Sequence, residues 1–389
     1  MTRTHPSFLQ APLSFALTLA ASMAAAQPAN APGNHGLALP SRQRSARRRR
    51  PPVLQTRRGA PRLRVVAAVR TSVQPKSVEV SPDGRRLWVC NFGRVDQHNV
   101  YVYDADTLEQ VGTVTFPGNA VETAFSPDGR VAYVSNFRRG VVEVIDTASL
   151  AVTDEIEVGA NPKFMVVSPD GTSLYVALYT QEQVAVVDTV AGRVRQRLAT
   201  GEQPRGMAML PDGTLLVASF RSDFIQVFRD DRELRRFRTC PFPRHLQVTP
   251  DGERVVVTCT LGSIQTYAVA TGHRRLIAPT GRNPRSLGLS ADGRWAATAN
   301  FHSSDVTLVD LASRTHRTSE VPRADQLVGL AVRLSQAPDG PPRLRVFATS
   351  WNNRRLFVLE TVRPLPDAPA EDSTESTPSH ARPGRLGRP

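Results

Sequence analysis

The chain has 389 residues, of which 40% are hydrophobic and 22% charged, and its formal net charge is +14. This composition excludes a chain that is disordered throughout, and three cysteines are too few for a dense disulfide framework. The charge is unevenly placed, because residues 27–61 hold eight arginines and no acid. The net charge alone therefore does not indicate a globular body that binds nucleic acid.

Residues 1–26 have the pattern of a signal peptide. Arg3 supplies the positive end, residues 13–23 a short apolar stretch, and residues 24–26 a small-residue cleavage site. A retained membrane anchor is the alternative, although the apolar stretch is short for a span. We expect an exported protein, periplasmic or extracellular, with no transmembrane span in the mature chain.

Residues 27–61 form an arm that is rich in arginine and proline and poor in apolar residues, which predicts disorder. This arm either tethers the protein to anionic envelope polymers or is only a soluble spacer. At the other end, residues 364–389 show no apolar period and are predicted to be a disordered tail.

One turn sequence, typified by Ser-Pro-Asp-Gly at 126–129, recurs seven times between residues 62 and 363. Its aspartates are separated by 45, 42, 42, 39, 41 and 47 residues. Proline, aspartate and glycine in this order favour a tight β-turn. Each turn precedes short segments of alternating apolar and polar residues, such as RVAYV at 130–134, which predict β-strands.

A repeat of about 40–45 residues with strand content is typical of propeller blades. We therefore predict an all-β fold for residues 62–363: a seven-bladed β-propeller with four-stranded antiparallel blades. The segment RLRVVAAVRTSVQP at 62–75 matches the end of a repeat, whereas the last copy stops at residue 362 without an outer strand. The N-terminal strand should therefore complete the last blade and close the ring.

The repeats resemble the YVTN-repeat β-propeller family. The resemblance is carried by VGANPKFMVVSPDGTSLYVA at 158–177 and by YVSNF and VVEVIDTAS at 133–149, and it covers about residues 62–363. Blades four, five and seven depart from the pattern, for example with VTCTLG at 257–262 in place of YVSNF. The resemblance implies an exported bacterial seven-bladed propeller, but it implies little about chemistry.

Cationic side chains are predicted to gather around one mouth of the channel. The residue five positions before each turn faces the channel in this fold, and it is a cation in five blades: Lys76, Lys163, Arg205, Arg244 and Arg285. The other two blades carry Val121 and, by a looser alignment, Gln326.

Aromatic side chains recur on the same face, in the loop between the second and third strands. They are Phe92, Phe137, Tyr179, Phe220, Phe301 and Trp351, with Arg138 beside Phe137. Cations attract phosphate or carboxylate, and aromatic faces stack bases or sugars, so these residues are candidate ligand-binding residues. The alternative is that the aromatic rings pack between blades and that the arginines are only solvated.

The pattern favours an exported, non-catalytic binding or scaffold propeller that uses this cationic, aromatic-rimmed face. Its partner is an unidentified protein or an anionic envelope polymer, and we expect a monomer. The first alternative is a polyanion or single-stranded nucleic-acid binder. The second, implied by propellers of similar repeat, is a lactonase-type hydrolase, for which no catalytic residues can be assigned.

No sequence motif for a metal, haem or nucleotide cofactor is present, so none is expected. His245 and His302 fall on the cationic face with Glu122 nearby, but their spacing matches no metal motif. Cys240 replaces the glycine and Cys259 the asparagine of the repeat on the same face of blade five. A disulfide between them is a hypothesis, with two free thiols as the alternative.

Overall fold

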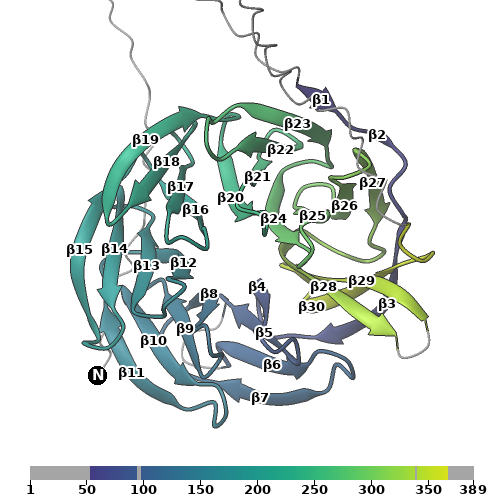
Figure 1. Cartoon of the computed structure of the whole chain (residues 1–389). Coiled ribbons are helices and arrows are strands. Elements are labelled where there is room, and N and C mark those ends of the chain that lie inside the picture. The colour runs from purple at the N-terminus through teal and green to yellow at the C-terminus, as the bar shows by residue number, and fades with distance from the viewer. Residues whose placement is uncertain (1–52, 94–97, 338–339, 367–389) are drawn as a thin grey trace, which may run out of the picture. The chain divides into compact units, whose positions relative to one another are not determined.

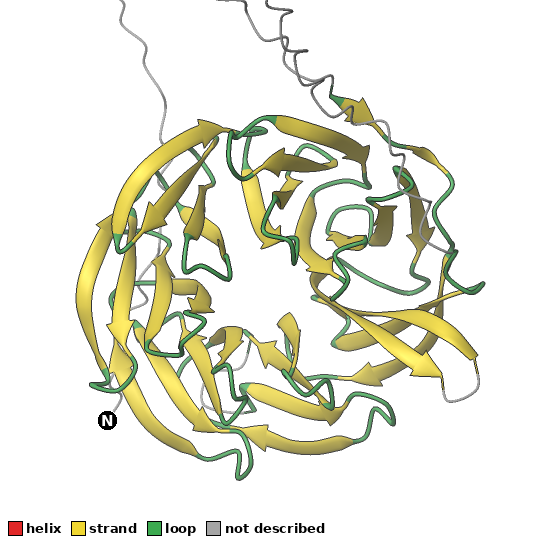
Figure 2. Cartoon of the chain, in the orientation of Figure 1, coloured by secondary structure: helices red, strands yellow, loops and turns green. Residues whose placement is uncertain are grey.

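The computed structural model describes residues 53–93, 98–337 and 340–366. The chain divides into two units, Met1–Arg49 and Arg50–Pro389, and every described residue belongs to the second. The predicted signal peptide, most of the predicted arm and the tail from residue 367 lie outside the described residues. Within the described part there are strands, turns and loops but no helix (Figure 2).

Seven four-stranded antiparallel blades form a ring, so the predicted fold class and blade number are confirmed (Figure 1). The inner strands, which surround the axis, are β4 (Pro75–Val80), β8 (Ala120–Phe125), β12 (Pro162–Val167), β16 (Pro204–Met209), β20 (Pro243–Val248), β24 (Pro284–Leu289) and β28 (Leu327–Ala337). The second strands are β5 (Arg86–Asn91), β9 (Val131–Asn136), β13 (Ser173–Leu178), β17 (Leu215–Ser219), β21 (Arg254–Cys259), β25 (Trp295–Asn300) and β29 (Gly340–Ser350).

The third and outer strands complete each blade. The third strands are β6 (Val100–Asp104), β10 (Val141–Asp146), β14 (Gln183–Asp188), β18 (Phe224–Arg229), β22 (Ser263–Ala268), β26 (Asp305–Asp310) and β30 (Arg355–Thr361). The outer strands are β7 (Gln110–Val114), β11 (Val152–Glu157), β15 (Arg193–Ala199), β19 (Arg232–Arg238), β23 (Arg274–Pro279), β27 (Thr315–Glu320) and β3 (Leu63–Arg70).

The ring closes as the sequence predicts. The order of the last sheet is β28-β29-β30-β3, and β3 pairs antiparallel with β30 from Leu63 opposite Thr361 to Arg70 opposite Arg355. The first ordered blade strand therefore supplies the edge that the last repeat lacks. By pairing with β30, β3 covers the edge that this third strand would otherwise leave open, and it joins the start of the propeller to its end.

The recurring turn fixes where each inner strand ends. In blade one the amide of Gly84 donates to the carbonyl of Ser81 at 2.8 Å, and the Ser81 hydroxyl donates to Asp83 at 2.5 Å. Gly84 has a φ of 73°, a conformation that glycine adopts at little cost. The Ser81 hydrogen bond also lowers the pKa of the Asp83 carboxyl. The turn is thus held by its own side chains, which is why it can be recognised in sequence.

The hydrophobic core lies between the blades. Among the described residues the buried apolar side chains form seven clusters, and each cluster joins two neighbouring blades. For example, Trp88 of blade one packs in the same cluster as Val134 and Ile145 of blade two. Because a single blade cannot bury its faces alone, stacking around the ring supplies the apolar burial that stabilises the fold.

The start of the ordered chain differs from the prediction. Strands β1 (Leu54–Gln55) and β2 (Arg57–Arg58) lie in the predicted disordered arm, yet they pair parallel to β23 and β27 at the outer edges of blades five and six (Figure 1). Ala60 is buried, and its carbonyl accepts a hydrogen bond from Arg317 at 2.7 Å. Residues 54–60 of the predicted arm therefore lie against the propeller, because two exposed sheet edges offer hydrogen bonds that the sequence of the arm does not reveal.

The predicted tail also begins slightly too early. Leu365 packs against the cluster between blades six and seven, and the Pro366 carbonyl accepts a hydrogen bond from Arg294 at 2.6 Å.

Candidate functional site

Five cationic side chains converge on one small cavity in the central channel. Each is the second residue of an inner strand, in blade one and in blades three to six. The cavity measures about 30 Å³, which is room for about two water molecules. It is lined by Lys76, Lys163, Arg205, Arg244 and Arg285, together with Glu122, Phe164, His245, Ser286 and Val328. We call the five cations the collar; the structure brings all five predicted positions together.

In blade seven the collar position is Val328, so the predicted residue Gln326 is wrong. Leu327 pairs with Ser350 as Pro75 pairs with Asn91, which aligns Val328 with Lys76. The error arises because β28 is longer than the other inner strands, so the distance from the turn no longer locates the channel residue.

Glu122 places a carboxylate in the same cavity, directly after the collar position of blade two. The register of the inner strand shifts here, between Ala120 and Thr123, and equivalent shifts occur in β12 and β20. Such bulges turn an additional side chain toward the channel. They account for the residues after the collar position, Glu122, Phe164 and His245, which all line the cavity.

Aromatic rings stand beside the collar cations and alternate with them. Lys163 Nζ lies 3.6 Å from the ring centroid of Tyr179 and 5.8 Å from that of Phe137. The guanidinium of Arg205 lies 5.5 Å from the Tyr179 ring and 5.2 Å from the Phe220 ring. These cation–π contacts hold each cation between the loops of two blades.

The same contacts recur at the other collar cations. Arg285 lies 3.2 Å from the Phe301 ring centroid, Arg244 5.6 Å from that of Phe220, and Lys76 5.7 Å from that of Trp351. Phe92 packs against both Phe137 and Trp351, with ring centroids 5.8 and 5.9 Å apart. All six predicted aromatics therefore lie in this ring. Five of them contact collar cations, whereas Phe92 packs only against its aromatic neighbours in these contacts.

Burial and mutual repulsion act on the collar charges. Burial, followed by the charges of Arg205 and Arg285, holds the pKa of Lys76 well below its usual range. Burial, followed by Arg205 and Lys76, does the same to the pKa of Lys163. Burial and the charge of Arg205 lower the pKa of Arg285 to about 10, and its Nε is buried with no hydrogen-bond partner among the described residues. Burial and mutual repulsion therefore disfavour the charged forms of these side chains, and Glu122 is the one acidic residue among those that line the cavity.

The acidic and imidazole groups of the channel are shifted toward their neutral forms. Burial raises the pKa of Glu122 to about 7, although the nearby charge of Lys76 opposes this shift. Burial and the charge of Glu122 raise the pKa of Glu79 well above its ordinary value. Burial lowers the pKa of His245 to about 4, and its Nδ1 accepts a hydrogen bond from the Leu287 amide at 3.1 Å. His245 is therefore neutral near pH 7, with its proton on Nε2.

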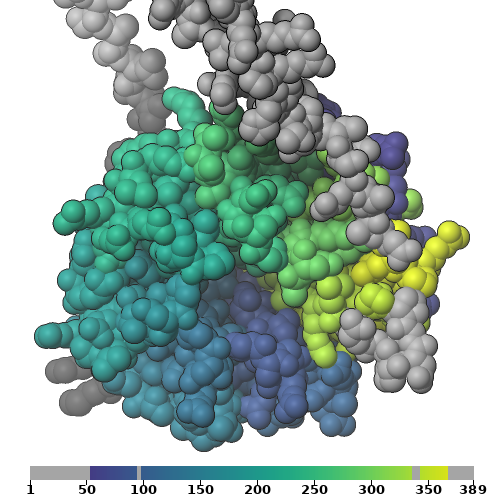
Figure 3. Space-filling view, viewed as in Figure 1, coloured from purple at the N-terminus to yellow at the C-terminus, as the bar shows by residue number. Residues whose placement is uncertain are grey.

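A larger space of about 440 Å³ continues from the small cavity toward the rim that bears the recurring turns. Its wall includes Phe125, Phe164, Val166, Met209 and Leu289. A space-filling view shows the ring hollowed at its centre (Figure 3). The sequence gives no signal for this wall beyond the apolar residues of each inner strand, because those residues are equally expected in an interblade core.

Arg138 does not join the collar. It is exposed at the tip of its loop and lines a shallow depression with Phe137 and Arg139. Arg139 forms an ion pair with Glu155. His302 lies on the loop face against Phe301, with ring centroids 5.3 Å apart, and does not line the small cavity.

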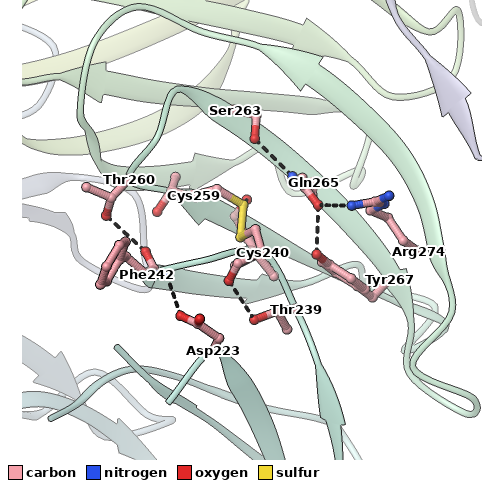
Figure 4. The surroundings of a disulfide bond; sticks show 12 residues. Asp223, Thr239, Cys240, Phe242, Cys259, Thr260, Ser263, Gln265, Tyr267 and Arg274 are labelled. Carbon is pink, nitrogen blue, oxygen red and sulfur yellow. Dashed lines mark hydrogen bonds between the residues drawn. A yellow bond between two sulfur atoms is a disulfide. The ribbon is translucent and has the colours of Figure 1, made fainter. Parts of the chain in front are cut away.

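Cys240 and Cys259 form a disulfide on the loop face of blade five (Figure 4). Beside it, the Phe242 amide donates a hydrogen bond to Asp223 of blade four at 2.8 Å, and the Thr260 hydroxyl donates to the Phe242 carbonyl at 2.9 Å. The disulfide thus holds in place the loop that precedes β20, the strand that carries Arg244. The remaining cysteine, Cys90, is buried and free.

No group of three or more histidine, cysteine, aspartate or glutamate side chains in the described ranges is placed to hold a metal ion. Nor does this part of the chain contain a helix long and apolar enough to cross a membrane.

Part of the chain matches a known family. A family model described as "Lactonase, 7-bladed beta-propeller" matches residues 68–241, from within β3 to the end of blade four. No curated protein matches the chain. The match supports a propeller family, whereas the narrower assignment to YVTN repeats stays a prediction.

Two solved structures share the fold. Hydrazine synthase of Kuenenia stuttgartiensis is 22% identical with a TM-score of 0.64, over 76% of this chain and 97% of that chain. The β-propeller domain of Cps50 (Swd1) from Myceliophteria thermophila is 14% identical with a TM-score of 0.63, over 77% and 100%. At these identities the likeness shows the fold alone.

Proposed function

We propose that the channel of this propeller binds a small anion at the collar. The observation that carries the proposal is the convergence of five cations on a cavity that holds one carboxylate, Glu122. Like charges gathered in a partly buried site cost free energy, and an anion that contacts several of them offsets that cost. The buried, unpartnered Nε of Arg285 adds an unsatisfied donor at the same place.

A small anion is favoured over a polymer by the position of the collar. The cations line a cavity of about 30 Å³ inside the channel, whereas a polymer requires an open charged surface. Arg138 and other exposed arginines of the loop face offer such a surface, but they lie outside the cavity. Polyanion binding and a purely scaffolding role remain the alternatives.

The test is titration of the purified protein with acetate and with phosphate, followed by calorimetry, for the wild type and for the double variant Arg205→Ala and Arg244→Ala. We expect the double variant to lose at least tenfold in affinity, because hydrogen bonds to charged groups contribute about 1.5–3 kcal/mol each. The matched control is Arg138→Ala, which removes an exposed arginine of the same face and should bind as the wild type does. Equal binding by the double variant and the wild type would refute the proposal.

Lactone hydrolysis is a second candidate function, supported by the family match to residues 68–241 and by the position of Glu122. A carboxyl group with a pKa of about 7 suits a general base. Glu122 would take a proton from water, whose oxygen attacks the lactone carbonyl. The carbon–oxygen bond of the ring then breaks, and the released alkoxide takes the proton that Glu122 removed from water. The new carboxylic acid loses its proton to solvent, and the collar holds the resulting carboxylate.

A panel of lactones of different ring size tests this second candidate. Hydrolysis by the wild type that is lost in Glu122→Gln, with anion binding retained, would establish it. Absence of hydrolysis across the panel would leave the binding function alone. A variant Glu109→Gln, which changes an exposed glutamate outside the channel, controls for non-specific effects.

We further propose that the protein acts outside the cytoplasm, as its first 26 residues lead us to expect. The Cys240–Cys259 disulfide supports this location, because disulfides persist mainly in oxidising compartments. Fractionation of cells followed by immunoblotting tests it; protein found only in the cytoplasm, with its first residues retained, would contradict it.

A further inference from the structure

The collar cavity and the larger channel space share part of their walls. Glu122, Phe164 and His245 line both. Along β12 the order is cationic Lys163, then Phe164, then Val166 and Val167 near the turn. Strand β12 therefore connects the cationic collar to the apolar wall of the channel.

The larger channel space, of about 440 Å³, is apolar on one side. Phe125, Val166 and Met209 are half-buried and line it, and they also line a second space of about 460 Å³ at the turn-bearing rim. From Lys163 to Val167 the strand advances four residues, which is about 13 Å. An apolar path of this length starts at the collar and ends at the opposite mouth.

The acidic side chains beside this path are mainly uncharged at mildly acidic pH. Glu79 and Glu122 both line the larger channel space, and burial favours the protonated form of each. A protonated carboxyl can also donate a hydrogen bond to an anion held above it.

The collar cavity itself limits the anionic group. A cavity of about 30 Å³ favours a compact anionic group, and guanidinium groups such as those of Arg205 and Arg244 pair with the two oxygens of a carboxylate. A carboxylate is therefore the favoured head group.

We propose that the channel binds an alkyl carboxylate, with its carboxylate at the collar and its unbranched apolar chain in the space lined by Phe125, Val166 and Met209. The inference rests on the proposed anion binding at the collar and names the class of ligand. Charge complementarity fixes the orientation of the ligand, and apolar burial along the strand supplies affinity that a small anion lacks.

The experiment is calorimetric titration with acetate, butanoate, hexanoate and octanoate at one ionic strength. Each added methylene that enters the apolar space should tighten binding by up to about fourfold. Octyltrimethylammonium, which has the same chain and the opposite charge, should not bind.

The variant Val166→Glu tests the apolar space separately from the collar. We expect it to lose the increase in affinity with chain length, because a polar carboxyl group interrupts the apolar path. The matched control is Val190→Glu in an exposed loop of the same blade, where Val190 is 89% exposed. Met209→Glu provides a second channel variant if Val166→Glu does not fold, as judged by its melting curve.

The outcomes distinguish the two proposals. Wild-type affinity that is independent of chain length, with acetate binding lost in the Arg205→Ala and Arg244→Ala double variant, would overturn the alkyl carboxylate and leave anion binding intact. Failure of phosphate and of every carboxylate to bind would overturn both, whereas binding of phosphate alone would overturn only the alkyl carboxylate. Equal chain-length dependence in Val166→Glu and the wild type would show that the chain lies elsewhere, which also refutes the inference.

Discussion

The stability of the propeller should depend on pH through Glu122, and Glu122→Gln should remove that dependence. Burial raises the pKa of this carboxyl from 4.5 to about 7 in the folded protein. Below pH 4.5 the group is protonated in both states and contributes no difference. As the pH rises from 4.5 to 7, the unfolded chain releases the proton while the folded protein holds it, so unfolding becomes easier.

The size of the effect follows from the shift. A change of about 2.5 pKa units corresponds to about 3 kcal/mol of lost stability, complete above pH 7. The groups that act on Glu122 are Lys76, Lys163 and Arg205, which favour its charged form and keep the shift from being larger. The difference in free energy of unfolding between Glu122→Gln and the wild type should therefore rise by about 3 kcal/mol between pH 4.5 and pH 8.

Urea unfolding followed by tryptophan fluorescence, in zwitterionic buffers at five pH values, measures this difference. Zwitterionic buffers matter because an anion bound at the collar would alter the charge balance. Glu109→Gln, at an exposed position before the outer strand of blade one, shows how much of the response a surface carboxylate produces. A difference between Glu122→Gln and the wild type that is constant across pH would refute our account of the channel as a desolvated site.

Three further changes test other parts of the molecule. Replacing Cys240 and Cys259 together by serine should lower the free energy of unfolding by about 3 kcal/mol, since the disulfide closes a loop of 19 residues; an unchanged urea midpoint in the double variant would contradict this. Lys163→Met should raise that free energy by about 1 kcal/mol while weakening anion binding, because it replaces a partly buried cation with an apolar side chain of similar length; calorimetric melting and titration measure the two effects. Removal of residues 1–61 deletes β1 and β2 but leaves β3, and it should lower the free energy of unfolding by on the order of 2 kcal/mol without opening the ring. A truncated protein with the native melting temperature would show that the two strands add no stability.

The blade architecture was predictable because its determinants are local. Each turn is fixed by contacts among four or five consecutive residues, as in the hydrogen bonds of Ser81 and Gly84. Strand alternation and the repeat length then determine the number of blades, and the incomplete last repeat determines the closure. None of these inferences requires knowledge of which side chains meet across the ring.

The collar was predictable for the same reason, but its surroundings were not. A fixed offset from the turn locates Lys163 and Arg205, and it fails in blade seven, where the inner strand is longer. Glu122 and Phe164 face the cavity because of bulges in their strands, and a bulge follows from backbone geometry that sequence alternation does not encode. The parallel strands β1 and β2 were missed because their pairing depends on distant sheet edges.

The sequence leaves two interpretations of the aromatic residues, interblade packing and ligand contact, and the structure shows that one ring can pack between blades and also contact the collar cations. Phe220 packs at 5.4 Å from Phe242, and it also lies within 5.6 Å of both Arg205 and Arg244. A ring face that contacts a cation holds the side chain in place without neutralising its charge. Arg244 also donates one hydrogen bond to Asn283 at 3.4 Å, and its other N–H groups remain available to a ligand. If an anion binds as we propose, a collar ordered in this way should lose little conformational entropy on binding, so cations held by aromatic rings should bind it more tightly than cations alone.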